Sequence, residues 1–182
     1  MIIAQEKKAS NIAEYILYMW QIEDMIRAYN FDIQKIKENI INQFDQPDDI
    51  KEEMTVWYND LVNKMKEQEI AKQGHLDFIN HLIQELDELH RSLLHDPDEL
   101  EYIDAYNKAK PAIEDLRSKS KKAGAGDIEI CLEGLYGILL LRLQKKPLNA
   151  STQEALATIS HMMALLNTKY QKQKQTGDKN NS

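Results

Sequence analysis

The sequence is poor in the residues that several protein classes need. Its single cysteine excludes an internal disulfide framework and a zinc site built from several thiolates. Six glycines and four prolines in 182 residues are too few for an all-β fold, with its many tight turns. No apolar run reaches the roughly 18 residues of a membrane span, and the first residues do not resemble a secretion signal. We therefore expect a cytoplasmic protein that does not bind membranes.

Positive charge is also scarce. Lys and Arg together number 23, against 30 Asp and Glu, which gives a formal net charge of −7. Because a dedicated nucleic-acid binder requires a basic face, this balance argues against one. The hydrophobic fraction of 42% is sufficient for a sizeable core, and the chain length fits one domain.

Helical periodicity dominates the chain, and strand-like alternation is absent. Apolar residues recur at helical spacing in segments that are separated by Pro47, Gly74, Pro97 and Pro147. Alternatively, the segments on the two sides of Gly74 form a single longer helix that passes through this glycine. The pattern predicts helices over about 11–29, 33–44, 50–74, 76–95, 97–116, 127–143 and 151–170.

Several of these segments have recognisable boundaries. Asn11, Asp32 and Asp127 stand where helix N-caps are expected, and Ser151–Glu154 has the composition of a capping box. Pro111 lies inside the fifth segment and predicts a kink or a break there, since proline removes a helical hydrogen bond.

Two predicted helices, 11–29 and 127–143, are apolar on nearly all sides, which is typical of helices at the centre of a bundle. The sequence therefore predicts an all-α fold, in which residues 1–170 form a single-domain bundle of six or seven helices. The first and sixth of these helices are expected to be central. Residues 171–182 are polar and lack an apolar anchor, so we expect a disordered C-terminal tail.

The charged residues on the two central helices form the candidate polar pocket. Charged groups on largely buried helices must be paired or must reach solvent. They either line a ligand or partner site or form ion pairs that fix the helix register, and the second interpretation is favoured. The candidates are Glu14, Glu23, Arg27, Glu133 and Arg142.

Two pairs of carboxylates suggest an enzymatic alternative. Glu85-x-x-Glu88 and Glu101-x-x-Asp104 resemble the motifs with which all-α nucleotide pyrophosphohydrolases hold Mg²⁺. That resemblance implies a magnesium-dependent pyrophosphohydrolase, although the family's additional glutamate is replaced here by Gln84. All four carboxylates are expected to point away from the apolar stripes of their helices, which favours a solvated acidic face.

No other set of residues indicates catalysis, a metal site or a cofactor. The chain has no Glu-x-x-His pair, and Asp87-x-x-His90 occurs without a second copy. Cys131 lies in an apolar segment, where a buried structural thiol is expected. We therefore interpret the chain as a non-catalytic interaction or regulatory module whose partner is another protein or a second copy.

Two segments carry a resemblance to a known family. The segment Asn11–Arg27, and Glu133–Gly137 followed by Leu139–Leu143, resemble an uncharacterised bacterial family of about this chain length. The family is a domain of unknown function without an assigned activity. The resemblance therefore implies an all-helical fold and adds no catalytic residue.

Overall fold

The structure is a computed structural model that describes residues 2–120, 122 and 124–180. Within these residues all regular elements are helices, which confirms the predicted all-α class. None of them combines the length and the apolar character that crossing a lipid bilayer requires. The elements are α1 (Ile2–Ser10), α2 (Ile12–Ala28), α3 (Ile33–Asn39), the 3₁₀ turn η1 (Ile41–Gln43), α4 (Asp48–Glu67), α5 (Asp77–His95), α6 (Leu100–Lys119), α7 (Asp127–Leu143) and α8 (Ala150–Asn180).

The chain divides into two compact units, Met1–His81 and Leu82–Ser182, and α5 begins in the first and continues in the second. This division differs from the single bundle that we expected. The two helices with the most apolar sequences, α2 and α7, belong to different units, so the structure does not confirm that they form one shared bundle centre. Each unit is described separately below.

In the first unit, α1 packs along α2, while α3 and η1 pack on α4. The sequence did not predict α1, which is short and has few apolar residues, although Ala4 on this helix is buried. The N-cap of α2 is as predicted. Asn11 Oδ1 accepts from the N–H of Glu14 at 3.1 Å, and Asn11 Nδ2 donates to the Glu14 carboxylate at 3.3 Å.

Asp32 is also the predicted cap of α3, since its carboxylate accepts from the backbone N–H groups of Gln34 and Lys35. In contrast, α4 ends at Glu67 and does not reach Gly74. Glu69 takes the left-handed conformation that closes the helix, and the N–H of Ile70 donates to the Met65 carbonyl at 3.1 Å. The sequence analysis placed the end of this helix at Gly74 because glycine usually takes the left-handed position, whereas here a glutamate takes it.

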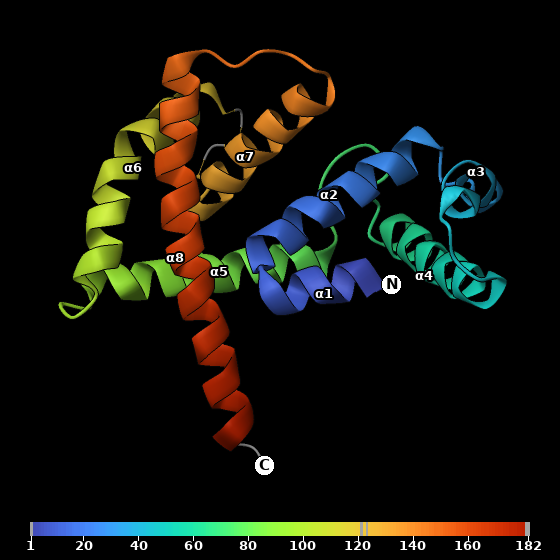
Figure 1. Cartoon of the computed structure of the whole chain (residues 1–182), viewed down its shortest axis with the longest axis horizontal. Coiled ribbons are helices and arrows are strands. Elements are labelled where there is room, and N and C mark those ends of the chain that lie inside the picture. Colours follow the sequence, from blue (N-terminus) through green and yellow to red (C-terminus); the bar gives the residue numbers. More distant parts are fainter. Residues whose placement is uncertain (1, 121, 123, 181–182) are drawn as a thin grey trace. The chain divides into compact units, whose positions relative to one another are not determined.

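In the second unit, α6 and α8 lie side by side, and α7 leans away from α8 toward the connection 144–149 (Figure 1). The predicted start of α6 was wrong, because the helix begins at Leu100 and not at Pro97. Of the kink or break predicted at Pro111, the break does not occur, since the helix continues through this residue. Pro111 and Asn107, whose carbonyl loses its helical donor, are both exposed, so solvent can satisfy that carbonyl.

The structure does not confirm a central position for α7. Its first half is buried at Ile128, Ile130, Cys131 and Leu132, but its second half has no buried residue. Leu143, the last residue of the helix, is 66% exposed. The apolar sequence of α7 therefore reflects a first half with buried side chains and a second half whose side chains are half-buried or exposed.

The last helix, α8, departs from the sequence prediction at both ends. Asn149 caps it and not Ser151, because Asn149 Oδ1 accepts from the N–H of Thr152 at 2.8 Å. The helix continues to Asn180, where a disordered tail from residue 171 was expected, while residues 181–182 lie outside the described residues. Lys174 explains part of this extension, because it pairs with Glu85 of α5 at 2.9 Å.

The cap of α2 provides a test of the first unit. Asn11→Ala removes both bonds to Glu14 and should lower the free energy of unfolding by about 1 kcal/mol, measured by urea denaturation. Asn59→Ala, at an exposed position inside α4, is the control and should not lower it, since alanine is the better helix former. Equal losses in both variants would contradict the assigned cap.

Candidate functional site

Two of the candidate residues, Glu23 and Arg27 on α2, hold the connection between α4 and α5. Glu23 is fully buried, and its carboxylate accepts from the backbone N–H of Leu76 at 2.9 Å. The other carboxylate oxygen lies 2.7 Å from Nδ1 of His75, whose ring stacks on Trp20 at a centroid distance of 4.4 Å. Both carboxylate oxygens of Glu23 therefore have partners within the protein.

Arg27 acts on the same connection. Its guanidinium donates to the carbonyls of Ile70 and Gly74 and pairs with Asp24 at 3.0 Å. These bonds, together with those of Glu23, fasten the non-helical segment 68–76 to α2. The geometry favours the structural interpretation of these two residues over a ligand pocket.

The remaining three candidates have separate partners. Glu14 pairs with Lys7 at 3.1 Å at the start of α2. Glu133 on α7 pairs with Lys122 at 2.8 Å and accepts from the hydroxyl of Ser120 at 3.2 Å. Arg142 lies exposed in the last turn of α7 and lines a surface hollow beside α8.

The four carboxylates of the enzymatic alternative are all exposed, as the helical geometry predicted. Glu85 accepts from the Tyr170 hydroxyl at 3.0 Å and pairs with Lys174, while Asp104 pairs with Lys108 at 2.6 Å. Two of the four carboxylates are thus already matched by cations. In the part of the chain that the structure describes, no group of three or more His, Cys, Asp or Glu side chains is placed to hold a metal ion.

A partly buried polar cluster joins α5, α6 and α7 around Asp127. The Tyr106 hydroxyl donates to Asp127 Oδ2 at 2.9 Å, and His90 Nε2 lies 3.6 Å from the same oxygen. Arg117 pairs with the other carboxylate oxygen. On the far side of the imidazole, His90 Nδ1 lies 2.7 Å from the Tyr102 hydroxyl. This Asp127 cluster therefore links five side chains from three helices.

The cluster keeps the Asp127 carboxylate charged. Hydrogen bonding from His90, then from Tyr106, together with the charges of His90 and Arg117, outweighs burial and lowers the pKa of Asp127 to about 2. Burial raises the pKa of Tyr106 to about 12 and also raises that of Tyr102. A carboxylate whose acceptor sites are occupied in this way is suited to anchoring α7.

Sequence reasoning missed most of this cluster. It placed Asp127 as the cap of α7, whereas Gly126 is the cap and Asp127 is the first helical residue. The available signals were His90 within the apolar stripe of α5 and the two tyrosines, Tyr102 and Tyr106, one turn apart on α6. Cys131 is buried as predicted, and burial raises the pKa of its thiol to about 12.

A groove in the second unit lies between α6, α7 and α8. A hollow of about 520 Å³ has apolar walls that include Leu116 of α6, Ile138 of α7 and Leu156 of α8. A neighbouring hollow of about 480 Å³ shares Leu156 and continues to Arg142. We call the two hollows together the α7–α8 groove.

The exposed end of α7 lies at the Arg142 end of this groove. Leu140 and Leu143 are 36% and 66% exposed, and three cations stand beside them. The side chains of Arg142, Lys145 and Lys146 are exposed and form no ion pair with any described residue. We call these five residues the α7 patch, which combines apolar surface with unmatched positive charge.

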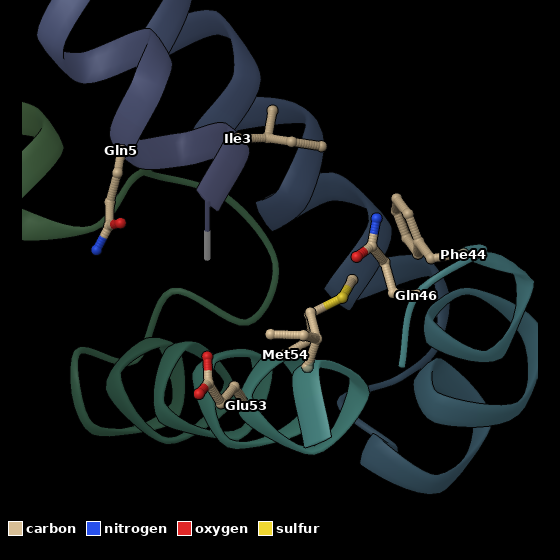
Figure 2. Close-up of a pocket in the computed structure, with 7 residues that line it drawn as sticks. Ile3, Gln5, Phe44, Gln46, Glu53 and Met54 are labelled. Carbon is tan, nitrogen blue, oxygen red and sulfur yellow. The ribbon is translucent and has the colours of Figure 1, made fainter. Parts of the chain in front are cut away.

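The first unit has a smaller cavity, of about 210 Å³, between α1, the segment after η1 and α4. Figure 2 shows Ile3 and Gln5 reaching it from α1, and Glu53 and Met54 from α4. Its walls are mainly apolar, with a few polar side chains at the opening, which is the usual composition of a small-ligand site.

Comparison with known proteins identifies the family. Residues 1–177 match the family described as Domain of unknown function (DUF4924), and the chain therefore belongs to it. This match confirms that the chain resembles a family of unknown function with about this chain length. No curated protein and no solved structure matches the chain.

The Asp127 cluster predicts how stability depends on pH. The folded-state pKa of Asp127 lies below its ordinary value of 3.8, so its contribution is complete above that pH and is lost as the pH falls toward 2. Asp127→Asn should lower the free energy of unfolding by about 1–2 kcal/mol at neutral pH, an amount discounted for partial exposure.

This difference should shrink as acid is added, in urea unfolding curves measured at several pH values. Asp115→Asn, which removes only an exposed pair with Lys119 on α6, is the matched control and should change stability little. A pH-independent loss in the Asp127 variant would contradict the charged state assigned to its carboxylate.

Proposed function

We propose that the protein is a non-catalytic interaction module whose second unit binds an amphipathic, acidic helical segment of a partner protein. The observation that carries the proposal is the α7 patch, where two exposed leucines stand beside three cations without ion-pair partners. Leu140 and Leu143 are one turn apart on α7 and stand beside these cations, and we infer that another protein covers this surface.

The shape of the surface favours a helix as the occupant. The α7–α8 groove is bounded by helices on its sides and is lined by aliphatic side chains such as Leu135, Ile138 and Ile159. An amphipathic helix can place apolar residues at intervals of one turn into such a groove. Its acidic residues would then meet Arg142, Lys145 and Lys146 at the end of α7.

The charge of the protein as a whole favours a protein partner over an anionic membrane. The formal net charge of −7 opposes approach to a negatively charged lipid surface. The positive charge of the α7 patch is local, and its effect is confined to about 8 Å at physiological ionic strength. Such a patch can select acidic side chains in direct contact.

The magnesium-dependent alternative receives no comparable support. Glu85 and Asp104 already have cationic partners, and Glu88 and Glu101 face solvent on the outer sides of their helices. The sequence motif therefore remains the sole argument for pyrophosphohydrolase activity at Glu85, Glu88, Glu101 and Asp104.

The proposal is tested with two designed helical peptides that share a leucine face. One carries Glu and the other carries Lys at the remaining positions, and binding is followed by fluorescence anisotropy. The Glu peptide should bind more tightly, because its charges complement the α7 patch. Lys145→Glu with Lys146→Glu should weaken its binding about tenfold, and Leu143→Gln should weaken binding of both peptides.

Lys172→Glu is the matched control, since Lys172 is an exposed cation farther along α8 and away from the groove. It should leave the affinity unchanged. Equal binding of the two peptides, or equal effects of the control and the double variant, would contradict the proposal. A light-scattering mass of two chains that reverts to one in Leu143→Gln would assign the surface to a second copy instead.

A further inference from the structure

We propose that the cavity of the first unit binds a small alkylammonium group, either as a free amine or as the lysine side chain of another protein. This inference is independent of the proposed function, because it concerns only residues of α1, α4 and the segment between η1 and α4. The cavity is bounded by Ile3 and Gln5 on one side, by Phe44 and Gln46 on another, and by Ile50, Glu53 and Met54 below.

The size of the cavity limits the ligand to a short chain. Its volume of about 210 Å³ lies below the roughly 300–1,000 Å³ of pockets for drug-sized molecules. The side chains that form its apolar wall are Ile3, Phe44, Ile50 and Met54. Met54 is almost fully buried, and its unbranched thioether can adjust to an alkyl chain of different lengths.

The charge of the cavity selects a cation. Glu53 is the one charged side chain among the lining residues, and it forms no ion pair with any described residue. The nearby Lys37 pairs with Glu52 at 3.0 Å and is therefore already engaged. An ammonium group would supply a positively charged partner for the Glu53 carboxylate, whereas a carboxylate ligand would be repelled by it.

Polar groups at the opening complete the recognition. Figure 2 shows the carboxylate of Glu53 rising from α4 toward α1, while the carboxamide of Gln5 descends from α1. The carboxamide of Gln46 lies on the opposite side of the cavity. An ammonium group donates hydrogen bonds, and the Glu53 carboxylate and the carboxamide oxygens of Gln5 and Gln46 are acceptors of matching chemistry along the cavity.

The test uses n-butylammonium as the probe and follows the methyl NMR signals of the whole chain. Signals of Ile3, Ile50 and Met54 should shift in a saturable manner with millimolar butylammonium. Neutral n-butanol and anionic butyrate, which have the same chain length, should cause at most weak shifts that do not saturate. Equal saturable binding of butanol would overturn the proposal, because the charge of Glu53 would then play no part.

Glu53→Gln removes the charge and nearly preserves the size of the side chain. It should weaken butylammonium binding about tenfold, as expected for loss of a charge-assisted hydrogen bond. Glu52→Gln is the matched control, since Glu52 is exposed, adjacent in sequence and already paired with Lys37. Unchanged binding in the Glu53 variant, or an equal loss in the control, would overturn the assignment.

The two sources of the ligand are distinguished with a blocked lysine, Nα-acetyl-lysine methylamide. Tighter binding of the blocked lysine than of butylammonium would assign the site to a lysine side chain of a protein. Tighter binding of butylammonium would assign it to a free amine, because the blocked backbone then hinders entry. Saturable binding of neither probe would overturn the proposal.

Discussion

The contact between Asp127 and the side chains of Arg117, Tyr106 and His90 determines how the second unit is built. Asp127 is the first residue of α7, so a bond at this point sets where the helix starts and in which direction it runs. Its partners come from α5 and α6, and the buried residues of α7 follow directly behind it. A charged carboxylate is costly to bury unless it is paired, and here the pairing outweighs that cost because three donors converge on it.

The first unit uses the same combination of an acidic and an arginine side chain for a different purpose. Glu23 and Arg27, one turn apart on α2, bind the backbone of the segment 68–76 through Leu76 N–H and the Ile70 carbonyl. These bonds hold the backbone of the segment, together with the burial of Leu76 and the stacking of His75 on Trp20. In both units, therefore, charged residues that could be mistaken for a ligand site satisfy backbone groups and fix the geometry of a connection.

The sequence predicted helix type and most helix positions, because the apolar spacing of α2, α4, α5 and α6 is regular and Asn11 and Asp32 are clear caps. It could not predict the division into two units, since an apolar helix looks the same whether it is buried by one neighbour or by several. It also misjudged helix ends that depend on geometry and not on composition, as at Glu69, where a non-glycine residue takes the left-handed conformation. The long-range partners of the candidate Glu23 and of the expected cap Asp127 could not be predicted, because the spacing along one helix does not show which side chains of another helix contact it.

The composition of α7 explains why an exposed apolar surface is compatible with this fold. Its apolar residues occupy all sides of the helix and it packs on α6, but fully buried residues occur only in its first half, so apolar side chains near its end remain partly uncovered. Gly134 permits this close packing, because a Cβ there would lie 2.5 Å from the Leu116 side chain, whereas the site of a Cβ on Gly137 is open space. The first half of α7 is thus packed closely against its neighbours, and its second half is packed less closely. Since Leu140 and Leu143 lie at the incompletely covered end of α7, beside Arg142, Lys145 and Lys146, their exposure follows from the way the helix packs, and binding is the use that we propose for this surface.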